Sequence, residues 1–487
     1  TRGVILKSGL DDVFVEDTTG KATALFDIDT TSAAPNRYAG NLSLRVDADG
    51  LTVEAGEDAY LGGDVESFTN PSWAWDGNYV EGFVNVSGTL ANSDRYSSSF
   101  GGGEDALSVD ATGISVVADD QVYAVGLLAD VEMDLAVSNA YLGEDNTAVS
   151  NAGIIDANAS GIAIANVDAI GDVLLKYSYV ESASISVSLD QDDNSAYVDA
   201  NSPVTRSGLD FDNMFGGVAV ENDVIALNVE GISVDSQDYA GVKYSTVHFE
   251  SIDVSAASQG AGAIGSVFDG ADLSMNDIID LDVAGLDVHA ADNIYIDDVD
   301  VDFDRVSSSV SGDTYIEAVM GSSDSFDDSD ILSVDFVGIS AISNAEDVDV
   351  DNITVDATLY TGAYGQLRIS ANDDGTWTVD PDGNDIVESS VVGLYARDDG
   401  STDVGGANIT LANTINVKGN ASTIGVNGDI VDSDITGIDV RSYFGNVDVG
   451  ADGWGERVDL FVEIDEGIYI EGYLSAGSEN IVDVDQV

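Results

Sequence analysis

The sequence of 487 residues contains no cysteine, and only 15 lysine and arginine residues stand against 91 aspartate and glutamate residues. Without cysteine the chain has no disulfide framework and no thiol chemistry. The formal net charge of −76 excludes nucleic acid and anionic membrane surfaces as partners, because binding their phosphates needs clusters of Lys and Arg. A chain this acidic repels itself unless cations screen or bridge it. The composition therefore predicts a salty or divalent-rich setting outside the cell.

Long apolar runs are also missing. No stretch of 18 apolar residues occurs, so the sequence predicts no transmembrane segment. The chain starts at Thr1 rather than at a methionine, and we expect a mature, processed product that is soluble or assembled on a surface. With 44% apolar residues, 19 Tyr and 14 Phe, there is enough material for a core, and disorder is not expected despite the charge.

The signatures of catalysis are absent as well. The two histidines, His248 and His289, occupy the polar phase of alternating segments, and no nucleophile elbow, phosphate loop or zinc-ligand spacing occurs. We therefore do not expect an enzyme. The alternative is a calcium-dependent polysaccharide lyase, because such enzymes use parallel β-helices. Its base would be Arg305 or Arg441, although a strongly anionic surface would repel a uronate substrate.

An internal repeat is the main feature that is present. In the segment from Asp277 to Val306 apolar residues alternate with polar ones, which is the period of a strand with one buried face. No helical period competes with it. The repeat pairs an Asp with a Gly-Ile or Gly-Leu eight residues later, and it occurs six times: Asp105 and Gly113, Asp223 and Gly231, Asp277 and Gly285, Asp330 and Gly338, Asp385 and Gly393, Asp429 and Gly437.

The spacing of the repeat predicts the architecture. Successive repeat glycines, including a degenerate copy at Gly161, are on average 54 residues apart, and such periods are typical of solenoids, propellers or arrays. We predict an all-β, elongated fold, a β-solenoid or β-helix with units of about 54 residues; tandem β-sandwich units are the alternative. Each unit is expected to hold four to six short strands. Two Asp-Gly turns, at Asp374-Gly375 and Asp382-Gly383, also predict a hairpin.

The ends of the chain are less regular than its middle. We interpret residues 1–104 as an N-terminal cap with degenerate first repeats, 105–445 as the regular β repeat array, and 446–487 as a C-terminal cap with a terminal strand. The end strands of a solenoid invite pairing with another chain. Terminal strands within residues 1–15 and 480–487 are therefore expected to join one subunit to the next in a homopolymer.

The recurring Asp has two interpretations. Carboxylates from adjacent units can bind Ca²⁺, a hard cation that takes oxygen ligands. Alternatively, each Asp forms a corner by accepting hydrogen bonds from backbone amides two residues on. The candidate metal ligands are the repeat residues Asp105, Asp223, Asp277, Asp330, Asp385 and Asp429, together with Asp380 and Asp382 of the dense oxygen-rich segment Asp-Pro-Asp-Gly-Asn-Asp.

Two tryptophans are the candidate contact for a glycan or another partner. Trp73 and Trp75 lie on the same face if their segment is extended. Exposed aromatics in that arrangement can stack on a sugar ring, whereas aromatics in a strand also pack into a core or a subunit contact. The sequence leaves both interpretations open.

The phrases Gly-Ile-Ser-Val, Gly-Leu-Asp-Val and Gly-Ile-Asp-Val, followed by Val-Asp-Val runs, resemble acidic surface proteins of marine or halophilic prokaryotes. These include β-solenoid adhesins, fimbria-like proteins and subunits of surface layers or extracellular filaments. The resemblance covers most of the chain and implies a β-rich fold and a location at the cell surface. Our first hypothesis is a structural subunit of an extracellular filament, sheath or surface layer, with or without calcium bridges. An adhesin ectodomain that binds glycans or another cell is the second.

Overall fold

The structure is a computed structural model. It describes the following residues: 1–9, 11–29, 44–62, 79–91, 94–97, 105–144, 153–167, 171–191, 198–199, 218–220, 223–266, 271–274, 277–319, 325–327, 329–372, 378–379, 383–424, 426–450, 460–477 and 481–486.

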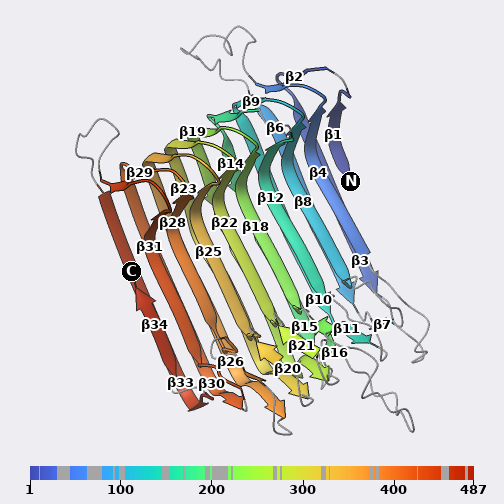
Figure 1. Ribbon diagram of the computed structural model, residues 1–487. Coiled ribbons are helices and arrows are strands. Elements are labelled where there is room, and N and C mark those ends of the chain that lie inside the picture. Colours follow the sequence, from blue (N-terminus) through green and yellow to red (C-terminus); the bar gives the residue numbers. More distant parts are fainter. Residues whose placement is uncertain are drawn as a thin grey trace.

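The described strands form one continuous stack of coils (Figure 1), and every pairing between them is parallel. Sheet A runs the length of the stack with its strands in chain order, one strand per coil. It consists of β1 (Arg2–Lys7), β4 (Leu44–Ala55), β8 (Leu107–Ala118), β12 (Ile155–Asn166), β18 (Ile225–Ser236), β22 (Ile279–Ala290), β25 (Leu332–Ser343), β28 (Glu388–Asp398), β31 (Val431–Ser442) and β34 (Val482–Gln486).

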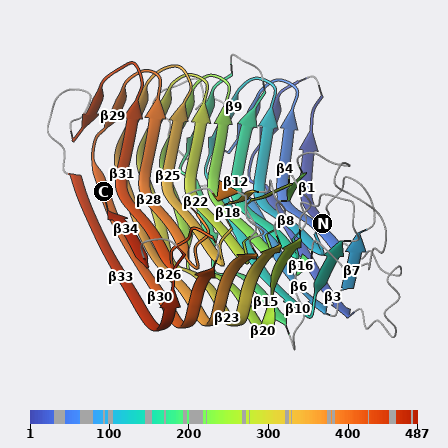
Figure 2. The ribbon, with the colours of Figure 1, turned by 60° about the horizontal axis from the view of Figure 1, so that its bottom comes forward.

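Sheet B forms the other main wall of the stack (Figure 2). Its strands are β2 (Val13–Val15), β3 (Thr19–Asp29), β5 (Ala59–Leu61), β6 (Val80–Ala91), β7 (Asp94–Ser97), β9 (Val122–Val125), β10 (Leu127–Ser138), β11 (Tyr141–Glu144), β13 (Val173–Lys176), β14 (Tyr179–Ser182), β15 (Ile185–Gln191), β16 (Val198–Asp199), β19 (Ala240–Phe249), β20 (Ile252–Ser266), β23 (Ile294–Val319), β26 (Val348–Asn372), β29 (Thr402–Val404), β30 (Ala407–Ile424), β32 (Val447–Val449) and β33 (Leu460–Ser475). A small sheet C holds β17 (Val218–Val220), β21 (Ala271–Ser274), β24 (Ser325–Asp327) and β27 (Thr378–Val379).

The predicted all-β solenoid is confirmed. Among the described strands, the coils that begin at β4, β8, β12 and β18 hold four to six strands as expected, whereas from β22 onward each coil holds three, some of them longer than expected. The coil that starts at β22 continues into β23, a strand of 26 residues with a corner near its start. The turn at Asp382-Gly383 lies partly outside the described residues, and β27, next to it, pairs in parallel with β24 of the preceding coil. Hydrogen bonds to the neighbouring coils satisfy the backbone N–H and C=O groups along the whole strand. The turn residues next to a strand therefore do not decide which strand it pairs with.

The repeat glycines bend the strands of sheet A. In β22 the buried positions are Leu281 and Val283 before Gly285, and Leu286 and Val288 after it, so the inward phase shifts by one residue at the glycine. A Cβ at Gly285 would lie 2.4 Å from Cγ1 of Val301 in sheet B. The glycine therefore lets the two sheets approach each other, which explains why the repeat requires it.

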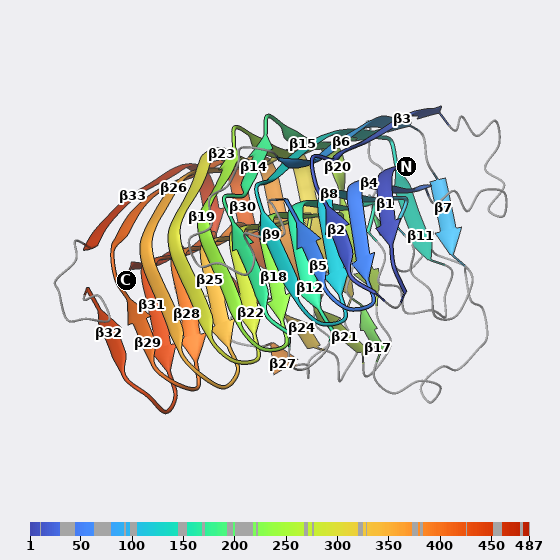
Figure 3. The ribbon, with the colours of Figure 1, turned by 90° about the horizontal axis from the view of Figure 1, so that it is seen from above.

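The core consists of columns of aliphatic side chains between the sheets. The residue after each repeat glycine is fully buried through the middle of the stack, as with Ile232, Leu286 and Ile339. The rings of Phe249 and Phe303 stack from neighbouring coils with 5.0 Å between their centroids. Each coil thus covers the apolar face of the next, and Figure 3 shows this succession from the blue end to the red end.

Sheet B has a corner, for example between β13 and β14, and the residue at this corner has a left-handed backbone conformation. Tyr177, Tyr244, Asp298 and Asn352 occupy the same corner position in four successive coils, with φ between 51° and 59°. Non-glycine residues take this conformation only at a cost of about 1 kcal/mol. The rings of Tyr177 and Tyr244 stack with centroids 4.9 Å apart, and that contact offsets part of the cost.

Candidate functional site

The repeat aspartates meet in one column at the corner where each coil enters sheet A. They stand two residues before β8, β18, β22, β25 and β31, and three residues before β28. Because sheet A is parallel and in register, residues at one level of successive coils become neighbours along the stack. The period detected in the sequence therefore places these carboxylates side by side.

From Asp223 to Asp385, the carboxylate of each repeat Asp accepts a hydrogen bond from a backbone N–H of the next coil. The backbone N–H of Asp277 donates to Oδ1 of Asp223 at 3.0 Å, and that of Asp330 donates to Oδ1 of Asp277 at 2.5 Å. Asp385 donates to Asp330 in the same way, and Asp429 donates to Asp385. We call Asp223, Asp277, Asp330, Asp385 and Asp429 the aspartate ladder. The partners in these hydrogen bonds are 44 to 55 residues apart and belong to neighbouring coils, so they are not the local contacts, to an amide two residues on, that define an Asp corner.

Gly153 separates Asp105 from the ladder. The N–H of Gly153 donates to Oδ1 of Asp105 at 2.7 Å, as an Asp would at that position. A Cβ at Gly153 would lie 2.1 Å from the carbonyl oxygen of Asp223, so only glycine fits. Because Gly153 has no carboxylate, the column continues only from the following coil.

Burial gives the ladder unusual electrostatics. Asp330 and Asp385 are only 2% and 3% exposed. Desolvation, followed by the charge of Asp223, raises the pKa of Asp277 well above its usual value, and desolvation with the charge of Asp277 does the same to Asp330. Burial raises the pKa of Asp385 to about 7. Near neutral pH the ladder therefore needs either protons or a cation to balance its charge.

One part of the ladder has the donor set for a cation. Carboxylate oxygens of Asp330, Asp385 and Glu388 lie within 4.8 Å of one another. One oxygen of each aspartate accepts the inter-coil hydrogen bond, and the Asp330 carboxyl is also hydrogen-bonded to Glu388, so a cation at this place would replace the proton that these two groups share. Asn384 is fully buried and its side-chain amide has no hydrogen-bond partner, a state that usually calls for a water or an ion. These residues fit Ca²⁺, which takes six to eight oxygen ligands.

Glu388 was not among the residues selected from the sequence. It is the first residue of β28 and lies beside Ser333 and Asp432 on the neighbouring strands. It lies three residues after Asp385, at the position that Asp280, Ser333 and Asp432 occupy in the neighbouring coils. The residue type at this position varies from coil to coil, so the repeat did not single it out.

Four selected residues fall outside the described part of the chain. These are the candidate metal ligands Asp380 and Asp382, and the candidate glycan contacts Trp73 and Trp75. Their roles therefore stay predictions.

The two arginines considered for lyase chemistry are paired with carboxylates. Nη2 of Arg305 lies 3.2 Å from Oδ1 of Asp253. Arg441 contacts Asp439, whose hydrogen bond and negative charge raise the pKa of the guanidinium. A catalytic base needs the opposite shift, because it must release its proton before it can accept one.

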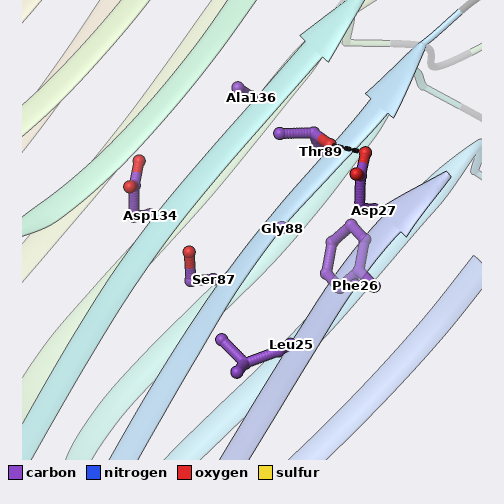
Figure 4. A pocket seen from close by; sticks show the side chains of 8 residues that line it. All are labelled: Leu25, Phe26, Asp27, Ser87, Gly88, Thr89, Asp134 and Ala136. Carbon is purple, nitrogen blue, oxygen red and sulfur yellow. Dashed lines mark hydrogen bonds between the residues drawn. The ribbon is translucent and has the colours of Figure 1, made fainter. Parts of the chain in front are cut away.

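A shallow depression of about 540 Å³ lies on sheet B near the N-terminal end. Figure 4 shows Leu25, Phe26 and Asp27 of β3 on one side and residues of β6 and β10 on the other. Oγ1 of Thr89 donates a hydrogen bond to Oδ1 of Asp27 at 2.7 Å. The lining offers one carboxylate pair, Asp27 and Asp134, on an open surface, and no arrangement in it activates a nucleophile or a water.

The two end layers expose residues that the middle coils bury. In the last coil Val462 and Val449 are 40% and 41% exposed, whereas their partners in the preceding coil, Ile409 and Val404, are fully buried. Among the described strands, β33 pairs only with β30, and β3 at the other end pairs only with β6. Within the described residues, the strand edges at both ends are therefore open, and exposed apolar side chains such as Phe14 and Val462 lie in these end coils.

Comparisons with known proteins leave the function to be argued from these features. No protein-family model matches the chain, and no curated protein or solved structure matches it either. In the described residues no helix is long and apolar enough to cross a membrane.

Proposed function

We propose that the protein is a structural subunit of an extracellular filament, sheath or surface layer, and that copies assemble through the strand edges at the two ends of the solenoid. The observation that carries the proposal is the pair of open end layers. Strand edges with exposed apolar side chains add further strands readily, and soluble proteins normally cover or charge them.

The rest of the molecule suits a structural role. Successive coils pair along their whole length in two parallel sheets, which makes the stack stiff. Outward positions carry many of the 91 acidic residues, as in the Asp300 and Asp302 pair of β23. This anionic coat keeps the sides of the stack apart, so association is directed to the ends. The same charge suits a setting rich in cations, outside a prokaryotic cell in brine or seawater.

Calcium is the second part of the proposal. A Ca²⁺ ion held by Asp330, Asp385 and Glu388 would balance the charge of the buried ladder and tie two coils together. At neutral pH in millimolar Ca²⁺ we expect the melting temperature to rise by several degrees, since a ligand bound only to the folded state stabilises it. The variant Glu388→Gln should lose most of this rise, whereas Glu250→Gln, an exposed residue after β19, should keep it.

The assembly is tested by negative-stain electron microscopy of the purified protein in millimolar calcium and again after chelation. Filaments or sheets are expected. If they dissolve on chelation, calcium bridging is supported. If they persist, calcium is not required for assembly. Isolated short rods at all calcium and protein concentrations would contradict the structural role, and binding to glycan arrays, with Trp73→Ala and Trp75→Ala as variants, would then test the adhesin alternative.

A further inference from the structure

The anionic coat of the stack is interrupted on sheet B. Four segments of this sheet pair in register and lie side by side in the lower part of Figure 2: 307–315 of β23, 360–368 of β26, 414–422 of β30 and 467–475 of β33. Every second residue of each segment, counted from its first, points outward, and we call these twenty residues the tyrosine face. They include two acidic residues, Asp313 and Glu471. Two basic residues, Arg368 and Lys418, balance them, so the face has no net charge.

The same wall is strongly acidic elsewhere. The outward residues of β23 that precede the tyrosine face include Asp297, Asp300, Asp302 and Asp304. A surface that meets only water gains nothing from losing such charges, since they keep the protein soluble. Binding of an uncharged ligand removes water from the surface, and carboxylates resist that removal. The neutral tyrosine face is therefore suited to an uncharged ligand.

Two tyrosine rings of this face lie along the sheet. A Cβ at Gly362 would lie 2.5 Å from Cε2 and 2.7 Å from Oη of Tyr364. A Cβ at Gly467 would lie 3.0 Å from Cε2 of Tyr469. Each ring therefore lies over the glycine two residues before it in the strand, and only a glycine leaves it that space. Tyr364 and Tyr469 are nevertheless 39% and 63% exposed, so both rings are open to a ligand.

A polar side chain lies between the two rings. The glycines under the rings belong to β26 and β33, so the rings are two strand spacings, about 10 Å, apart along the stack. Asn416 of β30 pairs with Gly362 on one side and with Tyr469 on the other. Within the described residues its side-chain amide makes no hydrogen bond. The face thus presents ring, amide and ring over a distance comparable to the length of a disaccharide.

Neighbouring side chains engage the basic residues of the face. Nζ of Lys418 lies 2.9 Å from Oε2 of Glu471. The guanidinium of Arg368 lies over the ring of Tyr315, 5.7 Å from its centroid. An anionic ligand would therefore gain little from these cations and would meet the acidic coat around the face.

The composition of the face favours a sugar over another protein. Five of its twenty residues are tyrosines, and none has an aliphatic side chain. The centre of a protein interface is usually rich in apolar side chains. A sugar ring instead presents a C–H face that packs on an aromatic ring, and hydroxyl groups at its edge that bond to amides and hydroxyls.

We propose that the tyrosine face binds a neutral polysaccharide. The rings of Tyr364 and Tyr469 stack on its sugar rings, and the amide of Asn416 between them bonds to its hydroxyl groups. The inference goes beyond the proposed structural role, because it assigns a ligand to the side of the stack. It does not depend on how copies of the chain assemble.

Depletion by insoluble polysaccharides tests the proposal. The full chain is mixed with cellulose, chitin, an insoluble β-1,3-glucan and starch granules, and with calcium pectate as the acidic counterpart, at a protein concentration that stays in solution without them. We expect at least one neutral polysaccharide to bind the protein more tightly than pectate does. Tyr364→Ala and Tyr469→Ala should each weaken this binding about ten-fold, since each removes a stacking contact. Tyr364→Phe keeps the ring and should bind within about two-fold of the wild type.

Tyr443→Ala is the matched control. Tyr443 is 58% exposed but follows β31 of sheet A, far from the tyrosine face in the fold. This variant should bind like the wild type. The variants change exposed side chains, so their melting temperatures should stay within a few degrees of the wild type. A rise in NaCl from about 0.1 M to about 1 M should change the affinity by less than about two-fold, because a neutral ligand makes no ion pairs that salt could screen.

The outcomes separate this inference from the proposed function. A wild type that binds none of the neutral polysaccharides would overturn it, and so would alanine variants that bind as well as the wild type or tighter binding to pectate. If Tyr364→Ala and Tyr469→Ala instead lose a self-association that the wild type shows in sedimentation, the face binds a second copy rather than a sugar. The presence or absence of filaments in the electron microscope tests the proposed function independently of these results.

Discussion

The middle coils and the last coil of this solenoid have the same apolar pattern and opposite exposure. Ile409 of β30 is fully buried, and its neighbour in the next coil, Val462 of β33, is 40% exposed. Val404 and Val449 differ in the same way. The residue types do not change between the two regions. What changes is whether another coil covers them, so the end coil has a core pattern that still needs a neighbour.

The largest expected difference between the two regions comes from a charge on the apolar face. Ile409→Lys buries an unpaired ammonium between two coils and should cost about 4 kcal/mol or more in unfolding free energy. Val462→Lys leaves the ammonium in water and should cost less than about 0.5 kcal/mol in dilute monomer. Urea unfolding at low protein concentration measures both, with Ile409→Val as a control that should lose about 1 kcal/mol. Equal losses would show that the last coil is already covered.

The repeat glycines give the next largest contrast. A Cβ at Gly338 would lie 2.5 Å from Cγ1 of Val355 and 2.6 Å from the carbonyl oxygen of Gly393. Gly338→Val should therefore destabilise the protein by about 3 kcal/mol. At Gly437 the close contact is a side-chain atom, Cγ1 of Val462, which can move. Gly437→Val should cost about 1 kcal/mol in thermal unfolding, and an equal cost at both sites would mean that the bend is equally rigid at the end.

The aspartate ladder makes the stability of the middle coils depend on pH. In the unfolded chain these aspartates ionise near pH 4, whereas the folded state keeps protons to about pH 7 at Asp385. Because the pKa values are higher in the folded state than in the unfolded chain, protons on the ladder stabilise the folded state fully below pH 4. This contribution is lost as the pH rises to 7. With chelator present, the wild type should lose about 2 kcal/mol between pH 4 and pH 8.

Asp330→Asn tests this dependence, because it keeps an acceptor for the Asp385 amide while it removes a charge. Its loss between pH 4 and pH 8 should be clearly smaller than that of the wild type, and Asp304→Asn, an exposed residue of β23, should behave like the wild type. Chemical unfolding across this pH range provides the measurement. A stability that rises towards pH 8 in chelator would contradict the protonated ladder.

The smallest effect is expected at the corners, where side chains are exposed and the difference between middle and end nearly vanishes. Tyr244→Gly relieves the left-handed backbone at φ 53° but loses the ring contact with Tyr177. The two effects should cancel to within about 0.5 kcal/mol. Tyr360→Gly, at an equally exposed position inside β26, should lose about 1 kcal/mol. Similar losses of unfolding free energy in both variants would show that the backbone at the corner is not strained.

The fold could be predicted from the sequence because the repeat is a property of single residues at fixed distances. The Asp and Gly of each unit mark the corner and the bend, and the alternation around Leu286 marks the buried face. Strand length could not be predicted in this way. We expected each unit to hold four to six short strands, but pairing with β20 and β26 on both sides keeps the segment Ile294–Val319 in one sheet.

The candidate site was only partly visible in the sequence. The spacing identified Asp277, Asp330 and Asp385, since one residue in each coil repeats at the period of the fold. The sequence did not distinguish the corner from a cation site, and the structure shows a contact that neither interpretation described, in which the carboxylate accepts a hydrogen bond from the backbone of the next coil. Glu388 was not singled out, because its position three residues after the repeat Asp holds a different residue type in successive coils, such as Ser333 and Asp432.

The axial repeat of the filament tests the central claim most directly. Helical reconstruction by electron microscopy should show strands stacked at about 4.8 Å along the axis. The described sheet A holds ten strands, so copies stacked end to end should give a subunit repeat of about 48 Å. Strands that run along the filament axis, or copies packed side by side with no such repeat, would contradict end-to-end assembly.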